Sequence, residues 1–184
     1  MAFGATYDAC VLCPAGLRDL LVRLGMAQLF RARWTDQILD EMVKAILSRR
    51  SDLTEQQLQR TRELMCAAVP DCLTTGFEGL IDGLDLPDPD DRHVLAAAIR
   101  ANSGVIVTEN VADFPESTLE PYNIEAQTPD IFVLHLIDLA PSTVRAVVET
   151  QAAELKKPPM TTGEVLDHLA LSGLPRSVAA LRYP

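Results

Sequence analysis

The chain has 184 residues and a net charge of −10, with 48% hydrophobic and 23% charged residues and a mean hydropathy of +0.10. This length suits one well-filled core with an appendage, and the composition excludes a disordered, collagen-like or membrane-spanning chain. The first ten residues lack the basic and apolar regions of a signal peptide, so we expect a soluble protein of the cytoplasm.

The charge is spread unevenly along the chain. Residues 71–130 hold two basic and thirteen acidic side chains, whereas residues 1–66 hold nine basic and eight acidic, and 131–184 hold five of each. A negative protein is repelled by nucleic acid, so unselective phosphate binding is disfavoured. Selective binding remains open through an arginine cluster in the first third, made of Arg31, Arg33, Arg49, Arg50, Arg60 and Arg62.

Short apolar strands alternate with helical patterns in the first two thirds of the chain. Val105-Ile106-Val107 is β-branched and uninterrupted, as a buried central strand is. Strands separated by helices predict a parallel sheet with helices on its faces, so the fold class is α/β. In chain order we first expect a strand over 3–8, a helix opened by Pro14 and capped by Gly25, and an extended segment over 29–34. Next come a helix capped by Thr35, and a helix opened by the capping box of Thr54 and Gln57 and stopped by Pro70. A short helix over 77–84, a helix from Asp88 and Pro89 to Gly104, and a strand over 105–107 follow.

From Thr128 onwards the pattern is helical alone. We therefore divide the chain into an α/β domain over residues 1–125 and an all-helical extension over 126–184. The extension is expected to pack on the domain through Phe132, Leu136 and Leu155. Its expected helices cover 129–139, 142–155, a third from the capping box of Thr161 and Glu164 to Gly173, and a short one after Pro175.

Acidic side chains gather where the predicted sheet would bind a ligand. Ligands of parallel sheets lie beyond the carboxyl ends of the strands. Asp8 and Asp113 follow strands there, Asp90 and Asp91 open the helix that leads into the second of these strands, and Glu41 lies in the first turns of its helix. Two carboxylates ~5 Å apart repel by about 3 kcal/mol, which a divalent cation relieves. Oxygen donors without a His or Cys cluster favour Mg²⁺ or Mn²⁺, and such ions hydrolyse phosphodiesters.

Each acid also has an ordinary structural explanation. Asp90 and Asp91 fall at a helix N-terminus, which favours carboxylates whatever the function. Periodicity does not separate Glu41 from Asp40. Asp8 is harder to explain without a ligand, because a carboxylate among apolar residues is costly unless it is paired or metal-bound.

A few further side chains have both structural and functional interpretations. Cys10 and Cys13 have the spacing of a zinc or redox pair, but no second pair follows, and burial as small hydrophobes is the better interpretation. Trp34 is expected to anchor the second strand in the core rather than to stack on a base. His93 is expected to be a solvated or capping residue rather than a substrate contact.

The acidic segments together resemble the PIN-domain ribonucleases, and within them the VapC-like toxins of toxin–antitoxin pairs. The similarity covers residues 5–120, and the helical remainder looks like the extension of one subgroup. The matching segments are Asp8-Ala9-Cys10-Val11-Leu12, Thr35-Asp36-Gln37-Ile38-Leu39-Asp40-Glu41, the run from Leu86 to Ala98, and the run from Val107 to Phe114.

The resemblance implies a PIN-like three-layer fold and a set of metal-binding, catalytic acids. These fall on Asp8, Glu41, Asp91 and Asp113, with Asp90 as a possible stand-in for Asp91. The family has polar side chains beside the last acid, and these fall on Thr108 and Asn110. It also has a hydroxyl and an amide directly after the first acid, where this chain has Ala9 and Cys10, so part of the support for the metal is expected to be missing.

The sequence thus predicts a Mg²⁺- or Mn²⁺-dependent endoribonuclease, the toxin of a toxin–antitoxin pair. Arg31, Arg33, Arg49 and Arg50 are expected to contact RNA phosphates. Expected partners are RNA, a cognate antitoxin and a second copy of the chain. Two other classes compete with this prediction: an aspartyl phosphatase, which needs a carboxylate where Cys10 stands, and an inactive PIN-like module that binds proteins.

Overall fold

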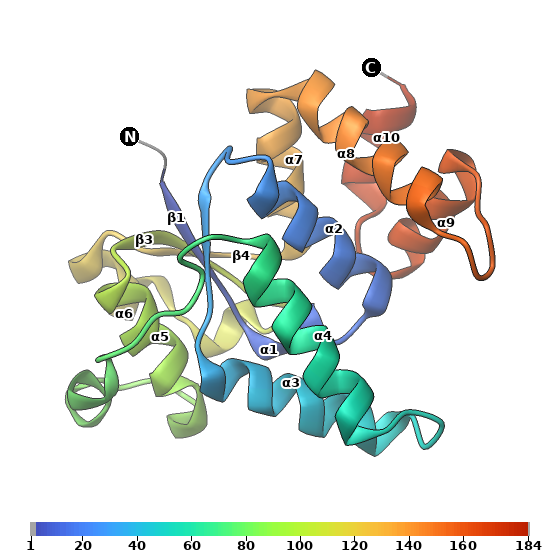
Figure 1. Cartoon of the computed structure of the whole chain (residues 1–184). Coiled ribbons are helices and arrows are strands. Elements are labelled where there is room, and N and C mark those ends of the chain that lie inside the picture. The colour runs from blue at the N-terminus through green and yellow to red at the C-terminus, as the bar shows by residue number, and fades with distance from the viewer. Residues whose placement is uncertain (1–2, 184) are drawn as a thin grey trace.

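A four-stranded parallel sheet organises the computed structural model, which describes residues 3–183 (Figure 1). The strands β1 (Gly4–Tyr7), β2 (Arg31–Arg33), β3 (Ser103–Val107) and β4 (Glu125–Gln127) lie in the order β2-β1-β3-β4. Ala5 of β1 pairs with Ala32 on one side and Val105 on the other. The predicted α/β class with a parallel sheet flanked by helices is confirmed.

The two central strands carry the apolar residues that the sequence pattern identified. Ala5, Tyr7, Ile106 and Val107 are fully buried, and burial of this kind is what holds a parallel sheet between helices. Sequence reasoning missed the edge strand β4, because Glu-Ala-Gln has neither an apolar run nor β-branched residues. β4 forms because β3 offers it a free edge.

Helices of the first third begin where their capping residues predict. Thr35 accepts a hydrogen bond from the Ile38 amide, and the capping box of Thr54 and Gln57 is formed. The expected cap at Gly25 is wrong: the helix runs on to Met26, and a Cβ at Gly25 would lie 3.0 Å from the Ala32 Cβ. Glycine stands there to let β2 approach the helix. The helices are α1 (Ala9–Leu12), α2 (Ala15–Met26), α3 (Asp36–Arg49) and α4 (Glu55–Ala68).

The middle of the chain is built from short helical turns around one regular helix. The expected helix from Asp88 to Gly104 is wrong in its extent, since the chain turns at Asn102, with a φ of 50°, and Gly104 belongs to β3. Asparagine tolerates this left-handed conformation better than most residues. The elements are η1 (Glu78–Gly83), η2 (Pro89–Asp91), α5 (Arg92–Arg100), η3 (Val111–Asp113), α6 (Glu116–Leu119) and η4 (Glu120–Tyr122).

Four helices follow β4 and pack on the α/β part of the chain. Phe132 is buried, with its ring centroid 5.0 Å from that of Phe30 and 6.3 Å from that of Tyr7. Leu136 is also buried, and Leu155 is half-buried against the core. The helices are α7 (Pro129–Leu139), α8 (Pro141–Glu154), α9 (Thr162–Leu171) and α10 (Pro175–Arg182), close to the predicted ranges.

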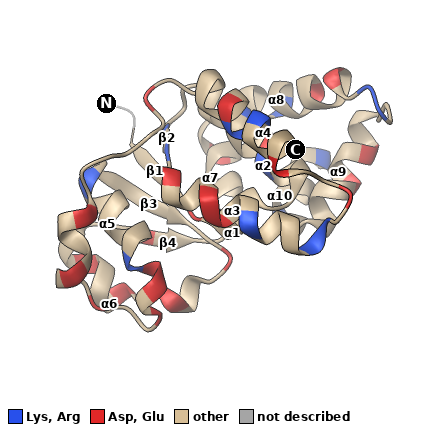
Figure 2. Cartoon of the chain, turned by 60° about the horizontal axis from the view of Figure 1, so that its bottom comes forward, with Lys and Arg blue, Asp and Glu red and all other residues tan. Residues whose placement is uncertain are grey.

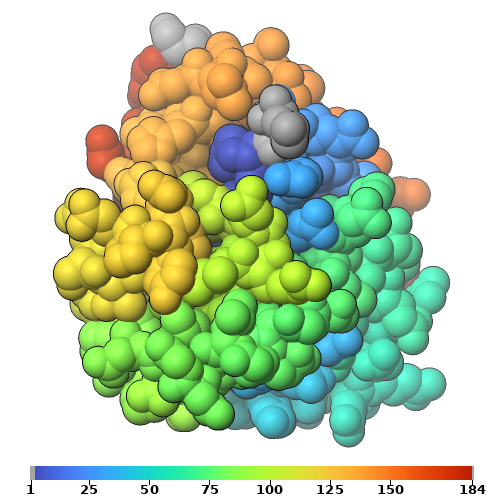
Figure 3. Space-filling view, turned by 90° about the vertical axis from the view of Figure 1, so that its left-hand side faces the viewer, coloured from blue at the N-terminus to red at the C-terminus, as the bar shows by residue number. Residues whose placement is uncertain are grey.

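Among the helices that the structure describes, none has the length and apolarity needed to cross a bilayer. The acidic middle segment forms one side of the molecule. Figure 3 shows this side: green to yellow segments, from about residue 75 to 125, cover most of it, with the orange C-terminal helices above. The charge imbalance of residues 71–130 is therefore also an imbalance between faces of the protein.

Candidate active site

Asp8 ends β1 and is held by three hydrogen-bond donors. The Ala9 amide donates to Oδ1 over 2.6 Å, which makes Asp8 the N-cap of α1. The Thr108 hydroxyl donates to Oδ2 over 2.7 Å and the Cys10 thiol donates to the same oxygen over 3.2 Å. Asp8 is 6% exposed. The cost of burying this carboxylate is offset by hydrogen bonds.

Asp91 lies close enough to other acids for their charges to act on it. The pKa of Asp91 is raised to about 6. Burial is the largest cause, the charges of Asp8, Asp88 and Asp113 add to it, and His93 acts in the opposite direction. A carboxyl group with several like charges nearby is disfavoured as an anion. These acids therefore form one electrostatic cluster at the carboxyl edge of the sheet. Asp90, the alternative third acid, is exposed, and its charge is not among those that shift the pKa of Asp91.

Glu41 reaches the cluster through His93. The Nε2 atom of His93 lies 2.8 Å from Oε1 of Glu41, and the histidine is 3% exposed. The expectation that His93 is solvated is therefore wrong, because the fold buries its ring and places Nε2 against Glu41 of α3. Asp40, which periodicity left as an alternative to Glu41, instead pairs with Arg62 of α4 at the surface. Of these two neighbouring acids, Glu41 is the one directed towards the site.

The loop after β3 donates backbone hydrogen bonds to the two side chains that contact Asp8, Thr108 and Cys10. The Asn110 amide donates to Thr108 Oγ1 over 3.0 Å, and the Glu109 amide donates to Cys10 Sγ over 3.3 Å. Asn110 thus contributes its backbone to the site, and its side chain is exposed. Burial, followed by the charge of Asp8, raises the pKa of the Cys10 thiol to about 12. Cys10 is therefore a protonated hydrogen-bond donor at neutral pH.

The donor set fits Mg²⁺ or Mn²⁺ in its chemistry, since Asp8, Glu41, Asp91 and Asp113 offer only carboxylate oxygens. The repulsion expressed in the pKa of Asp91 is the kind that a divalent cation removes. The acids are near one another without being in ligand geometry: within residues 3–183 no three His, Cys, Asp or Glu side chains are arranged to share an ion.

The candidate RNA-binding arginines lie at different places on the fold. Arg31 is level with Gly4, at the start of the strands and away from the acids, and Arg33 donates to the Asp71 carbonyl. Arg49 and Arg50 are exposed at the end of α3, and Arg50 is paired with Asp52 over 2.7 Å.

The helix α3 leads from the acidic cluster towards these last two arginines. Its first half is acidic and its second half is basic, with Lys44 and Arg49 exposed. Figure 2, which brings the bottom of Figure 1 forward, shows this change from red to blue near the label of α3. Burial raises the pKa of the Cys13 thiol, and the charges of Arg49 and Arg18 oppose that shift. Arg18, which was not among the predicted RNA contacts, therefore lies with Arg49 beside the end of α1.

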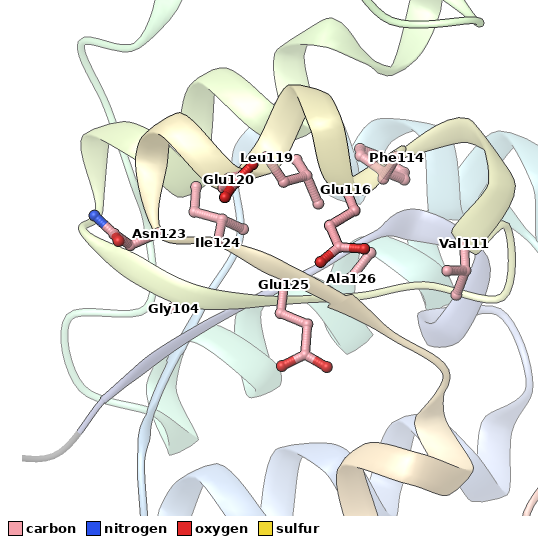
Figure 4. A pocket seen from close by; sticks show the side chains of 10 residues that line it. All are labelled: Gly104, Val111, Phe114, Glu116, Leu119, Glu120, Asn123, Ile124, Glu125 and Ala126. Carbon is pink, nitrogen blue, oxygen red and sulfur yellow. The ribbon is translucent and has the colours of Figure 1, made fainter.

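A cavity of about 580 Å³ lies apart from the four predicted acids (Figure 4). Glu116, Glu120 and Glu125 line it together with the buried side chains of Phe114 and Leu119. It opens beside the edge strand β4. Asp8, Glu41, Asp91 and Asp113 are not among the residues that line this cavity.

Sequence reasoning missed three contributors to the site. His93 supports Glu41, Cys10 supports Asp8, and Asp88 adds its charge to Asp91. The run Asp88-Pro89-Asp90-Asp91 was a visible signal for the last, but its helix-capping role concealed its effect on Asp91. The other two depend on tertiary contacts that no local pattern encodes. Trp34 is fully buried in the core, as predicted. Its ring stacks on that of Tyr7, with the ring centroids 6.0 Å apart.

Comparison with known proteins agrees with this architecture. A family model described as "PIN domain" matches residues 6–112, and one described as "VapC50 C-terminal domain" matches residues 129–183. A protein of Mycobacterium tuberculosis (strain ATCC 25618 / H37Rv), named "Putative ribonuclease VapC50", is 40% identical over 106 residues. That alignment covers 55% of this chain and 62% of the relative's length. No solved structure matches the chain.

The PIN model covers more than half of the chain, in the part that carries the parallel sheet and the acidic cluster. The second model covers the four C-terminal helices. The chain therefore belongs to the PIN-domain family, with a C-terminal region of the VapC50 type.

Proposed function

We propose that this chain is a Mg²⁺- or Mn²⁺-dependent endoribonuclease that acts in the cytoplasm as the toxin of a toxin–antitoxin pair. The observation that supports this most strongly is the meeting of the segments that follow β1 and β3, where the Thr108 hydroxyl donates to Asp8 Oδ2 over 2.7 Å. The charges of Asp8 and Asp113 from these segments both act on Asp91. Membership of the PIN family and similarity to a relative named as a ribonuclease support the same activity.

Four carboxylates are proposed to hold the cation: Asp8, Glu41, Asp91 and Asp113. Asp90 remains a weaker alternative to Asp91 because it is exposed. When bound, the cation supplies Lewis acidity and makes a water molecule nucleophilic near neutral pH. Thr108 orients Asp8, His93 orients Glu41, and the backbone of Asn110 fixes the Thr108 hydroxyl. These hydrogen bonds limit how far the carboxylates must move to bind.

The basic half of α3 is proposed to hold the RNA beside the acids. Arg49 and Lys44 are exposed along this helix, and a strand of RNA lying on it would pass Glu41. Arg50 and the β2 residues Arg31 and Arg33 are proposed as weaker contacts, because Arg50 and Arg33 already have partners and Arg31 lies at the opposite edge of the sheet. Local positive charge is needed because the chain as a whole repels phosphate.

The remaining proposals concern organisation and partners. Residues 1–125 are proposed as the nuclease domain and 126–184 as the helical extension, with β4 at the junction. A toxin requires a cognate antitoxin, which we propose as the protein partner, and self-association through helices is proposed as a homodimer.

Incubation of the pure protein with total cellular RNA, with Mn²⁺ or with a chelator, tests the proposed activity. New 5′ ends are mapped for the wild-type chain and for Asp8→Asn, Glu41→Gln and Asp91→Asn. We expect discrete Mn²⁺-dependent cuts that all three substitutions abolish. Asp40→Asn is the matched control, since it removes an exposed acid next to Glu41 and should leave cleavage intact, and Asp90→Asn tests the alternative to Asp91.

One observation favours a second candidate function, an inactive PIN-like module that binds proteins. The described residues hold no preassembled group of three metal-ligating side chains. This candidate predicts no cleavage and no heat of Mn²⁺ binding in calorimetry. Cleavage that survives in all three acid variants would contradict the proposal of a metal-dependent nuclease.

A further inference from the structure

Two short relays of hydrogen bonds converge on one oxygen of Asp8. In the first, the Asn110 amide donates to the Thr108 hydroxyl, which donates to Oδ2 of Asp8 over 2.7 Å. In the second, the Glu109 amide donates to the Cys10 sulfur, and the Cys10 thiol donates to the same Oδ2 over 3.2 Å. Each relay begins at a backbone amide of the loop after β3.

The charge of the Asp8 carboxylate selects one assignment of the hydrogen atoms in these relays. Cys10 Sγ also lies 3.5 Å from Thr108 Oγ1, so its single hydrogen has two possible acceptors. The hydroxyl hydrogen of Thr108 is directed to Asp8 over the shorter distance. A charged acceptor forms the stronger hydrogen bond, so the thiol hydrogen goes to the Asp8 carboxylate as well. The sulfur then accepts the Glu109 amide.

The donors leave one open position on the carboxylate. A carboxylate has about four lone-pair sites, two on each oxygen. Oδ2 uses both for Thr108 and Cys10, and Oδ1 uses one for the Ala9 amide. The position that remains is on Oδ1.

We propose that Cys10 is a positioning residue for the metal site: it holds Oδ2 of Asp8 and so leaves the open lone-pair position of Oδ1 as the one that would serve a cation. This assignment rests on the proposed metal dependence. It also gives Cys10 a supporting role at the first acid. The sequence predicted that support for the first acid is missing there, whereas the thiol supplies a donor to Asp8 in its place.

Cys13 provides a matched comparison within the same turn of the chain. Its thiol donates to the Ala9 carbonyl over 3.3 Å, and it makes no hydrogen bond with Asp8. Both cysteines are half-buried free thiols. A change at Cys13 therefore removes a thiol of similar burial without touching the relay.

The test is calorimetric titration of Mn²⁺ into the full chain at pH 7, with thermal unfolding of each apo protein measured beside it. The variants are Cys10→Ala, which removes the donor, Cys10→Ser, which keeps one, and Cys13→Ala. Loss of a hydrogen bond that orients a metal ligand weakens metal affinity by about tenfold or more. We expect that loss in Cys10→Ala, recovery in Cys10→Ser and no change in Cys13→Ala, with every titration run well below the apo Tm of the variant.

Each other outcome overturns a defined part of the account. If Cys10→Ala binds Mn²⁺ as tightly as the wild-type chain, or if both Cys10 variants lower only the apo Tm, Cys10 has a packing role and the assignment fails. If Cys10→Ser is as weak as Cys10→Ala, hydrogen-bond donation is not its function. If the wild-type chain binds no Mn²⁺, the proposed function fails and this assignment fails with it.

Discussion

Replacing Asp91 with asparagine should stabilise the apo protein while it abolishes function. Asparagine keeps the shape of the side chain and removes a charge that burial and three nearby acids disfavour. The pKa of Asp91 is about 6, against an ordinary 3.8, a rise of about two pH units. At 1.36 kcal/mol for each unit this corresponds to about 3 kcal/mol for a fully buried group.

The effect expected in solution is smaller than that limit. Asp91 is only half-buried, so solvent screening reduces the penalty to roughly half. The residue also precedes the first turn of α5, where a negative charge is favoured by about 0.5 kcal/mol. We therefore expect Asp91→Asn to raise the free energy of unfolding by about 1 kcal/mol at pH 7.

The pH dependence follows from the direction of the shift. Because the folded-state pKa is raised, the fold binds a proton more tightly than the unfolded chain does between pH 4 and 6. This contribution is fully present below about pH 4 and is lost as the pH rises through about 6. The stability gain of Asp91→Asn should therefore be near zero at pH 4 and reach its full value at pH 7.

Urea unfolding in chelator, at pH 4 and pH 7, measures this difference. Asp90→Asn is the control, because Asp90 is exposed and its substitution should change stability little at either pH. Added Mn²⁺ should reverse the order, since a ligand at a hundred times its Kd stabilises the wild-type chain by about 2.7 kcal/mol and the variant lacks the site. A variant no more stable than wild type at pH 7 would refute the crowding of charge around Asp91.

Three further predictions concern His93, Gly173 and Arg49. His93→Ala removes the polar contact of Nε2 with Glu41 Oε1 and should cost ~1–3 kcal/mol of stability and about tenfold in Mn²⁺ affinity, measured by urea unfolding and calorimetry. Gly173→Ala should cost ~1–3 kcal/mol in urea unfolding, since φ there is 100° and the new Cβ would lie 3.2 Å from Glu109 Oε1. Arg49→Ala should weaken RNA binding and reduce the slope of log K against log salt by roughly 0.7.

Matched variants separate these effects from general damage. His93→Gln keeps a donor, so equal Mn²⁺ affinity in His93→Ala and His93→Gln would contradict a role in holding Glu41. Gly163→Ala lies within α9 and should be neutral or stabilising by up to ~1 kcal/mol. Arg31→Ala should leave the slope of log K against log salt unchanged, because Arg31 pairs with Gly4 at the amino ends of the strands, opposite to the acids. An equal change in slope for Arg31→Ala and Arg49→Ala would count against the proposed path of the RNA.

Local signals in the sequence predicted the helices well. Capping by Thr35, Thr54 and Thr161 depends on residues three positions apart, so the sequence alone contains it. The strand β4 and the role of Gly25 depend on what another segment of the chain presents to them, and the sequence does not display that. Resemblance to a family supplied the order of the acids, and the parallel sheet explains why Asp8 and Thr108 meet.

The supporting contacts of the site were beyond sequence reasoning. His93 was interpreted by its place in a helix, yet the fold buries it and gives it Glu41 of α3 as a partner. Cys10 was interpreted as a loss relative to the family, yet its thiol contacts the carboxylate that the missing side chains would have served. Both errors have the same cause, because a hydrogen-bond partner from another element cannot be identified until the elements are packed.

The most direct test of the account is a crystal of the protein soaked in Mn²⁺, with anomalous scattering measured at the manganese absorption edge. The account predicts an anomalous peak in contact with Asp8 and with Asp91 or Asp113, and no such peak in a crystal of Asp8→Asn. A peak at some other place on the chain, or none at a concentration that binds in solution, would contradict the claim that these acids share a cation.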